Sequence, residues 1–127
     1  MFTDGEVIIP GVNTVFVRLS CLPEGCVHCV GVDNRADLHE VIWGTESLPE
    51  CAPGENNEPS SFARKCLVRK LAGLYQLNFR KLEVRRAKEA GELQPPKLYY
   101  GNRETSFDIS LSHDGKFVAY AFLKQLN

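Results

Sequence analysis

The most telling chemical group in this sequence is the imidazole of His113, which follows Ser112 at the end of an alternating apolar and polar run. The next two residues, Asp114 and Gly115, are typical of a tight turn between two strands, because both tolerate a positive φ. An imidazole at the rim of a sheet can donate a hydrogen bond to a phosphate, and its charge changes near neutral pH. The pattern therefore predicts a hairpin over residues 107–123 that presents His113 to an anionic ligand.

The run that ends at His113 also carries a family resemblance. Residues 109–114 (ISLSHD), followed by a strand of small residues, resemble the C-terminal motif of the phosphopantetheinyl transferase superfamily, and most closely its small holo-acyl-carrier-protein-synthase type. Gly31-Val32-Asp33 is similar to the Gly-hydrophobic-Asp motif of that family. Lys65, Lys70 and Gly73 fall in register with the two lysines and the glycine of its helix motif. The three motifs occur in the family's order.

This resemblance implies an enzyme that moves the phosphopantetheine arm of coenzyme A onto a serine of an acyl or peptidyl carrier protein, with magnesium as cofactor. It implies that Asp33 holds magnesium against the coenzyme A diphosphate and that Lys65 and His113 are the catalytic residues, with Lys65 nearest the chemistry. The residues it assigns to coenzyme A are Lys65, Lys70, Ser112 and His113. It also implies a homo-oligomer, a trimer or a dimer, because the small members resemble half of the larger two-lobed ones.

One position departs from the family pattern. The family takes a second carboxylate from the glutamate after the first helix lysine, and this chain has Cys66 there, a soft ligand that magnesium does not favour. Asp37, Glu40 or Asp114 could supply the missing acid. The alternative is a homologue that has lost the reaction and serves as a coenzyme A-binding, nucleotide-binding or protein-interaction module.

Each of these residues also has an ordinary structural explanation. Asp33 could be a turn or cap residue after a strand. Lys65 and Lys70 could belong to a solvated basic face of a helix. His113 could be a hairpin residue bonded to a neighbouring carbonyl. Their joint occurrence in the family's order is what favours the functional interpretation.

The cysteines suggest a different class of site. Cys21, Cys26, His28 and Cys29 lie within nine positions, and Cys26 and Cys29 have the two-residue spacing of a zinc knuckle. A structural zinc site needs a second such pair, which the sequence lacks. On a strand Cys26 and His28 face one side and Cys29 the other, so one ion cannot easily take all three. Ordinary buried cysteines are the competing interpretation.

The predicted order of helices and strands, which must position these residues, is typical of the α+β class. Alternating residues predict strands at 15–19, 26–32 and 97–100, a strand at 79–84, and the final hairpin. A short amphipathic helix is expected within residues 34–44, from Leu38, Val41 and Ile42. Residues 46–61 have the composition of a long loop. The main helix is expected at about 62–75, capped by Ser60 or Ser61, and packed across a mainly antiparallel sheet.

The length and composition of the chain limit the classes of protein to which it can belong. The chain has 127 residues and a formal net charge of −1, so we expect a single domain over 1–127 and no general attraction to nucleic acid or an anionic membrane. It has no apolar run long enough to span a bilayer and no secretory leader pattern, which predicts a cytoplasmic protein. Five cysteines, an odd number, argue against a disulfide framework.

Overall fold

A computed structural model describes residues 2–8, 14–22, 25, 27–49 and 58–124 of the chain. The chain divides into two compact units, Met1–Trp43 and Gly44–Asn127. The prediction that residues 1–127 form a single domain stays a prediction.

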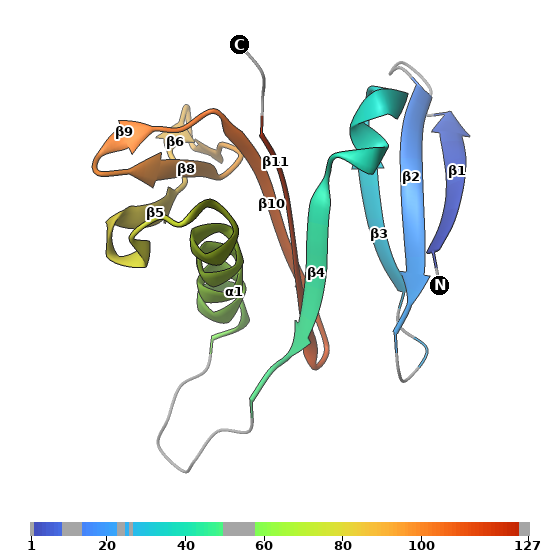
Figure 1. Cartoon of the computed structure of the whole chain (residues 1–127), viewed down its shortest axis with the longest axis horizontal. Coiled ribbons are helices and arrows are strands. Elements are labelled where there is room, and N and C mark those ends of the chain that lie inside the picture. The colour runs from blue at the N-terminus through green and yellow to red at the C-terminus, as the bar shows by residue number, and fades with distance from the viewer. Residues whose placement is uncertain (1, 9–13, 23–24, 26, 50–57, 125–127) are drawn as a thin grey trace. The chain divides into compact units, whose positions relative to one another are not determined.

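The first unit is a three-stranded antiparallel sheet followed by one turn of helix. Its elements are β1 (Phe2–Ile8), β2 (Thr14–Cys21), β3 (Val27–Val32) and the 3₁₀ helix η2 (Arg35–His39), and the strand order is β1-β2-β3 (Figure 1). Val17, Val30 and Leu38 are buried here. The side chain of Asn34 caps η2 by accepting a hydrogen bond from the backbone N–H of Ala36 at 3.0 Å.

β1 was not predicted from the sequence, and the conformation predicted for the segment after β3 was wrong. The helix expected within residues 34–44 is only the 3₁₀ turn η2, and the chain becomes extended at Ile42. Leu38 is buried as a helical periodicity requires, whereas Val41 and Ile42 are half-buried on either side of the change to a strand. Three apolar residues at mixed spacing fit both conformations over so short a stretch.

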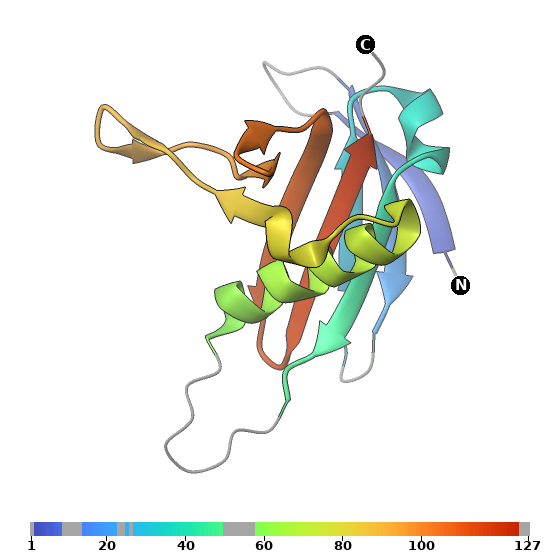
Figure 2. The same cartoon turned by 60° about the vertical axis from the view of Figure 1, so that its left-hand side comes forward.

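The second unit is built on one helix and a three-stranded sheet. The sheet has the order β10-β11-β4, from strands β4 (Ile42–Ser47), β10 (Phe107–Asp114) and β11 (Phe117–Lys124), and α1 (Pro59–Tyr75) lies across one face (Figure 2). The helix buries Ala63, Cys66, Leu67 and Leu71. This arrangement confirms the predicted α+β class, with one long helix packed on mainly antiparallel strands.

The helix begins earlier than predicted and ends where predicted. Pro59 occupies its first turn, where a missing N–H costs nothing, and Glu58 precedes it without a side-chain capping bond. Neither Ser60 nor Ser61 is the cap. At the other end Gln76 adopts the left-handed conformation, and its N–H donates to the Ala72 carbonyl, which closes the helix after Tyr75.

The final hairpin follows the predicted alternation closely. Asp114 pairs with Phe117, so the connection consists of Gly115 and Lys116, one residue later than the predicted Asp114-Gly115 turn. Gly115 has a φ of 56°, which is the conformation that requires glycine here. Ile109, Leu111 and His113 share one face of β10 with Val118, Tyr120 and Phe122 of β11, because cross-strand partners lie on the same face.

The remaining strands lie between α1 and the final hairpin in sequence. They are β5 (Leu82–Arg85), β6 (Lys88–Glu89), β7 (Glu92–Leu93), β8 (Lys97–Tyr100) and β9 (Arg103–Glu104). The predicted strand at 79–84 is a 3₁₀ turn, η3 (Phe79–Lys81), that leads into β5, whereas β8 matches its prediction. The β6–β7 hairpin projects as an arm (Figure 2).

The segment predicted as a long loop is shorter than expected. β4 extends to Ser47 and α1 starts at Pro59, and residues 50–57 lie outside the described part of the chain. Within the described residues, no helix has the length and hydropathy that a bilayer crossing requires.

Candidate functional site

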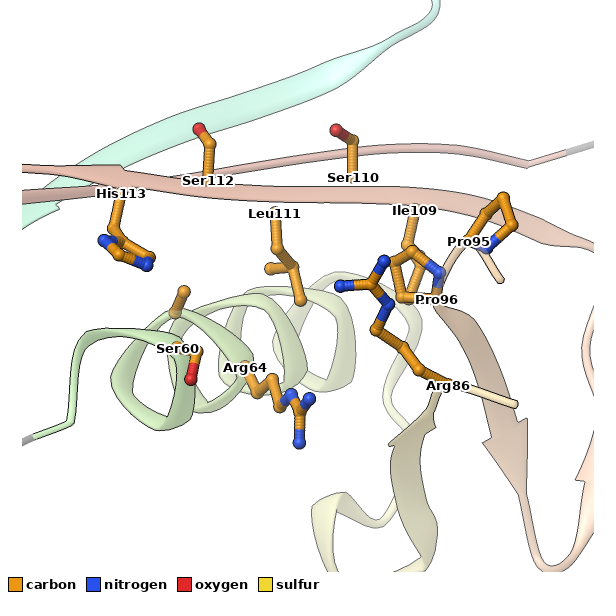
Figure 3. Close-up of a pocket in the computed structure, with 11 residues that line it drawn as sticks. Ser60, Arg64, Arg86, Pro95, Pro96, Ile109, Ser110, Leu111, Ser112 and His113 are labelled. Atoms are coloured by element: carbon orange, nitrogen blue, oxygen red, sulfur yellow. The ribbon is translucent and has the colours of Figure 1, made fainter. Parts of the chain in front are cut away.

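A groove of about 520 Å³ lies between the first turns of α1 and the edge strand β10, and it contains His113 (Figure 3). Ser60, Ala63 and Arg64 of α1 form one wall. Ile109 and Leu111 of β10 form another, and the connections that flank the β6–β7 arm close it. The residues from those connections are Arg86, Pro95 and Pro96. His113 thus lies on an outer strand beside the start of the helix.

This basic groove, as we call it, brings together three nitrogen-bearing side chains, those of Arg64, Arg86 and His113. No carboxylate is among the described residues that line it. The Nε of Arg86 donates to the Gln94 carbonyl at 2.9 Å, which fixes its direction, and its guanidinium reaches toward β10 (Figure 3). Guanidinium groups match the oxygens of a phosphate in pairs, so the groove is suited to an anionic phosphate ester.

Ser112 and His113 contribute to the groove in different ways. The imidazole of His113 points to the side of β10 that faces α1, together with the side chains of Leu111 and Ile109 (Figure 3). The Ser112 hydroxyl points to the opposite side of the strand, as strand alternation requires. Ser112 therefore borders the groove through its backbone.

The two predicted lysines lie on α1 outside the described lining of the groove. Both Lys65 and Lys70 are exposed. Lys70 stands one helical turn beyond Cys66 and shares its side of the helix, whereas Lys65, directly before Cys66, points elsewhere. Asp33 is exposed in the first unit, immediately after β3, while the other predicted site residues belong to the second unit.

A second polar contact in this unit involves Cys66, the residue that departs from the family pattern. Cys66 is only 1% exposed. Burial, followed by the hydrogen-bonding and electrostatic influence of the Glu46 carboxylate on β4, raises the pKa of the Cys66 thiol to about 12, while the charge of Arg69 opposes the rise. The thiol is therefore protonated at neutral pH.

Tyr120 of β11 lies close enough to Glu46 and Cys66 for both to affect its phenol. Burial raises the pKa of its phenol, and the charges of Glu46 and Cys66 add to the rise. Its ring lies directly over the backbone of Gly44, where a Cβ would be 2.5 Å from the Tyr120 Oη and 2.7 Å from its Cζ. Gly44 and Glu46 are two residues apart on β4 and so share the face that carries Tyr120.

The cysteine cluster near Cys26 belongs to the first unit. His28 is buried and its ring centroid lies 4.5 Å from that of Trp43, while Cys29 on the opposite face of β3 is exposed. Burial lowers the pKa of His28. Cys26 lies outside the described residues. Among those described, no three His, Cys, Asp or Glu side chains gather closely enough to hold a metal ion.

The sequence signals for Glu46 and Arg86 were present but weak. Gly44-Thr45-Glu46 repeats the glycine-x-acid pattern of Gly31-Val32-Asp33, yet the prolines that follow made it look like the start of a loop. Arg86 lies in a polar stretch without periodicity, and only the tertiary fold brings it to the groove that His113 also lines.

We compared the chain with protein-family models, with curated proteins and with solved structures, and none matches it. The interpretation of the groove therefore depends on its own geometry and on the motif resemblance.

Proposed function

We propose that this chain binds coenzyme A in the basic groove and acts as a phosphopantetheinyl transferase of the small holo-acyl-carrier-protein-synthase type. The observation that carries the proposal is that Arg64, Arg86 and His113 line one groove. His113 is the histidine of the motif that suggested the family, and the two arginines were no part of that resemblance. The motif and the two arginines thus support the same class of anionic ligand.

The walls of the basic groove suit the rest of coenzyme A. Ile109, Leu111 and Pro96 offer apolar surface next to the cations, and a binding site with apolar walls and a few charged groups is the usual form of a cofactor pocket. The phosphates would meet Arg64, Arg86 and His113 by charge-assisted hydrogen bonds. In this proposal Lys65 and Lys70 neutralise phosphoryl charge from the exposed side of α1.

The acceptor in this proposal is a serine of an acyl or peptidyl carrier protein, and the active form is a homo-oligomer, a dimer or a trimer. Both follow from the family resemblance. The α+β class, with a helix across a mainly antiparallel sheet, is compatible with the half-domain fold of the small enzymes.

Magnesium is the cofactor that the resemblance implies, and the donor set at position 66 does not fit it. Magnesium takes an octahedral shell of oxygen ligands, and the neighbour of the Glu46 carboxylate is a thiol. Asp37 and Glu40 belong to the first unit, and Asp114 is exposed at the tip of the final hairpin. Asp33 as a magnesium ligand stays a prediction.

The second candidate is a homologue that binds coenzyme A without transferring its arm. The specific observation in its favour is the buried, protonated Cys66 where the family has a carboxylate. A neutral thiol cannot balance the charge of a magnesium ion, which leaves phosphoryl transfer without the electrostatic stabilisation on which it chiefly depends.

Calorimetric titration of coenzyme A tests the binding step. Arg64→Ala, Arg86→Ala and His113→Ala should each weaken binding about tenfold to a hundredfold, because a hydrogen bond to a charged group contributes about 1.5–3 kcal/mol. Arg103→Ala is the matched control, since Arg103 is exposed on β9 and does not line the groove. Equal weakening by all four variants would contradict a site at the groove.

The transfer step is tested by mass. An apo carrier protein incubated with this protein, coenzyme A and magnesium should gain the mass of the phosphopantetheine arm. Coenzyme A binding without that gain would select the second candidate, and the absence of both would reject the family assignment altogether.

A further inference from the structure

Within the described residues, β10 has a free edge, and the basic groove lies against it. In the sheet order β10-β11-β4, β10 is an outer strand, and its ladder with β11 runs from Phe107 to Asp114 without a bulge. Five consecutive residues, 109–113, line the groove, so both alternations of the strand border it. Since alternate side chains point to opposite faces of a sheet, a groove that meets both sets lies along the edge of the strand (Figure 3).

The register of the hairpin determines which backbone groups point to this edge. Asp114 and Phe117 flank a two-residue connection, so they exchange backbone hydrogen bonds with each other. Because the pattern alternates along an antiparallel pair, the N–H and C=O groups of Ile109, Leu111 and His113 point away from β11. The described residues offer these outward groups no backbone partner. Natural proteins usually protect such an edge with a proline, a bulge or a very short strand, and β10 has none of these.

We propose that the basic groove binds an extended acidic segment of a partner protein, which joins the sheet as a strand beside β10. The backbone of such a segment supplies the hydrogen-bond partners that Ile109, Leu111 and His113 lack at this edge. In this mode of recognition the backbone bonds give affinity, and alternate side chains give specificity. The segment is a second ligand for the groove, and its binding depends neither on coenzyme A nor on transfer of the phosphopantetheine arm.

The charges in the groove determine the side chains of the partner. Arg64 on α1 and Arg86 lie on the helix side of β10, and the imidazole of His113 points to the same side (Figure 3). None of the described lining residues carries a negative charge. In an added strand, alternate side chains about 6.8 Å apart point to this side. Glutamate or aspartate at those positions matches the guanidinium groups by charge and by paired hydrogen bonds.

The free edge favours a peptide over a small anion and over a second copy of this chain. A phosphate ester can meet the arginines, but it has no row of N–H and C=O groups at strand spacing to pair with β10. Pairing of β10 with its own copy around a twofold axis would place two basic grooves next to each other. Like charges would then repel, whereas an acidic strand is attracted.

A synthetic peptide of about seven residues, with glutamate and threonine in alternation, is the probe, and coenzyme A is left out. Calorimetry should show binding to the full-length protein, and the same peptide with lysine in place of glutamate should not bind. Arg64→Ala and Arg86→Ala should each weaken binding about tenfold, because each removes a hydrogen bond between charged groups. Arg103→Ala is the matched control, since Arg103 is exposed on β9 outside the lining, and should change nothing.

Backbone methylation separates strand pairing from simple attraction of charges. One peptide carries N-methyl groups on all glutamates and another on all threonines, so in each only one edge of the strand loses its donors. We expect one of the two to bind at least about tenfold more weakly than the other. On the protein, the unmethylated peptide should slow amide hydrogen exchange at Ile109, Leu111 and His113, and change it little at Ser110 and Ser112, which already bond to β11.

Equal weakening by the two methylation patterns, uniform protection along β10 or binding of the lysine peptide would overturn the proposal, as would the absence of binding at about 1 mM peptide. Coenzyme A titrated into the same samples separates this proposal from the transferase. Peptide binding without coenzyme A binding rejects only the transferase, and the reverse rejects only strand addition. Where both bind they should compete, because they share Arg64 and Arg86, and simultaneous binding would overturn the placement of the peptide in the groove.

Discussion

At the scale of single residues, Gly44 is a position where the fold requires the absence of a side chain. The Tyr120 ring occupies the space above it, and a Cβ at this position would lie 2.5 Å from the phenol oxygen. Tyr120 is itself buried and cannot move away without leaving the core. The Tyr120 ring therefore packs on the backbone of β4 at a position where only glycine leaves room for it.

We predict that Gly44→Ala lowers the free energy of unfolding by about 1–3 kcal/mol, because the added methyl overpacks a rigid contact. Gly73→Ala is the matched control: it adds the same methyl group on α1, where nothing lies within 4 Å, and should stabilise the protein by about 0.5–1 kcal/mol. Urea unfolding of the three proteins measures both values. Shifts of the same sign would contradict this account of Gly44.

Among the described residues of the first unit, His28 is the buried titratable side chain. Burial lowers its pKa from the usual 6.5, so the unfolded chain binds a proton in a pH range where the folded chain does not. Stability therefore falls as the pH is lowered below 6.5 and through the folded-state pKa.

We predict that the urea midpoint of the natural protein falls more between about pH 7.5 and about pH 5.5 than that of His28→Phe. The phenyl ring keeps the contact with Trp43 and does not titrate. Other acidic and basic groups contribute alike to both proteins. An equal fall in the two midpoints would show that His28 is protonated equally in the folded and unfolded states.

At the scale of elements, the parts that the sequence predicted well are those with long, regular alternation. The final hairpin has eight residues in each strand and one turn signal, so few other structures fit it. The main helix was predicted from apolar residues at helical spacing, and its start was missed because Pro59 was counted with the loop. β1 (FTDGEVI) has neither clean alternation nor a turn signal.

The residues of the candidate site also differ in how well the sequence predicts their positions. His113 could be located from the sequence because it is tied to a hairpin whose register is fixed by local residues. Arg86 and Glu46 could not, because their neighbours in space come from segments distant in sequence, and nothing local records that proximity. The helix-like spacing of Leu38, Val41 and Ile42 also hid the strand that carries Glu46.

The β6–β7 arm contains a backbone conformation that its sequence does not favour. Its connection consists of Ala90 and Gly91, with φ values of 51° and 81°. Alanine at positive φ carries a steric cost of roughly 1–2 kcal/mol, whereas asparagine tolerates this conformation and Asn-Gly is the preferred pair in such turns.

We predict that Ala90→Asn stabilises the arm by roughly 1 kcal/mol. Amide hydrogen exchange of residues 88–93 is the measurement, because an exposed arm opens locally before the rest of the protein unfolds. Asn102→Ala provides the opposite control, since Asn102 has a φ of 68° in the β8–β9 turn and its replacement should speed exchange there. Faster exchange in Ala90→Asn would contradict the prediction.

At the scale of the whole molecule, the division into two units raises the question of how they unfold. The boundary falls between Trp43 and Gly44, inside β4, so one strand belongs to both. A unit as small as Met1–Trp43 buries too little apolar surface to be stable alone in most proteins. We therefore expect the two units to unfold together.

Trp43 and α1 provide separate probes of that expectation. Trp43 is the single tryptophan and packs on His28 in the first unit, so its fluorescence reports on that unit, while far-ultraviolet circular dichroism reports chiefly on α1 in the second. The two urea transitions should coincide. Val30→Ala, which removes buried volume in the first unit only, should shift both transitions by the same amount, and Leu71→Ala in the second unit should do likewise. If Val30→Ala moved only the fluorescence transition, the strand β4 would not couple the units, and the prediction of one domain over residues 1–127 would be wrong.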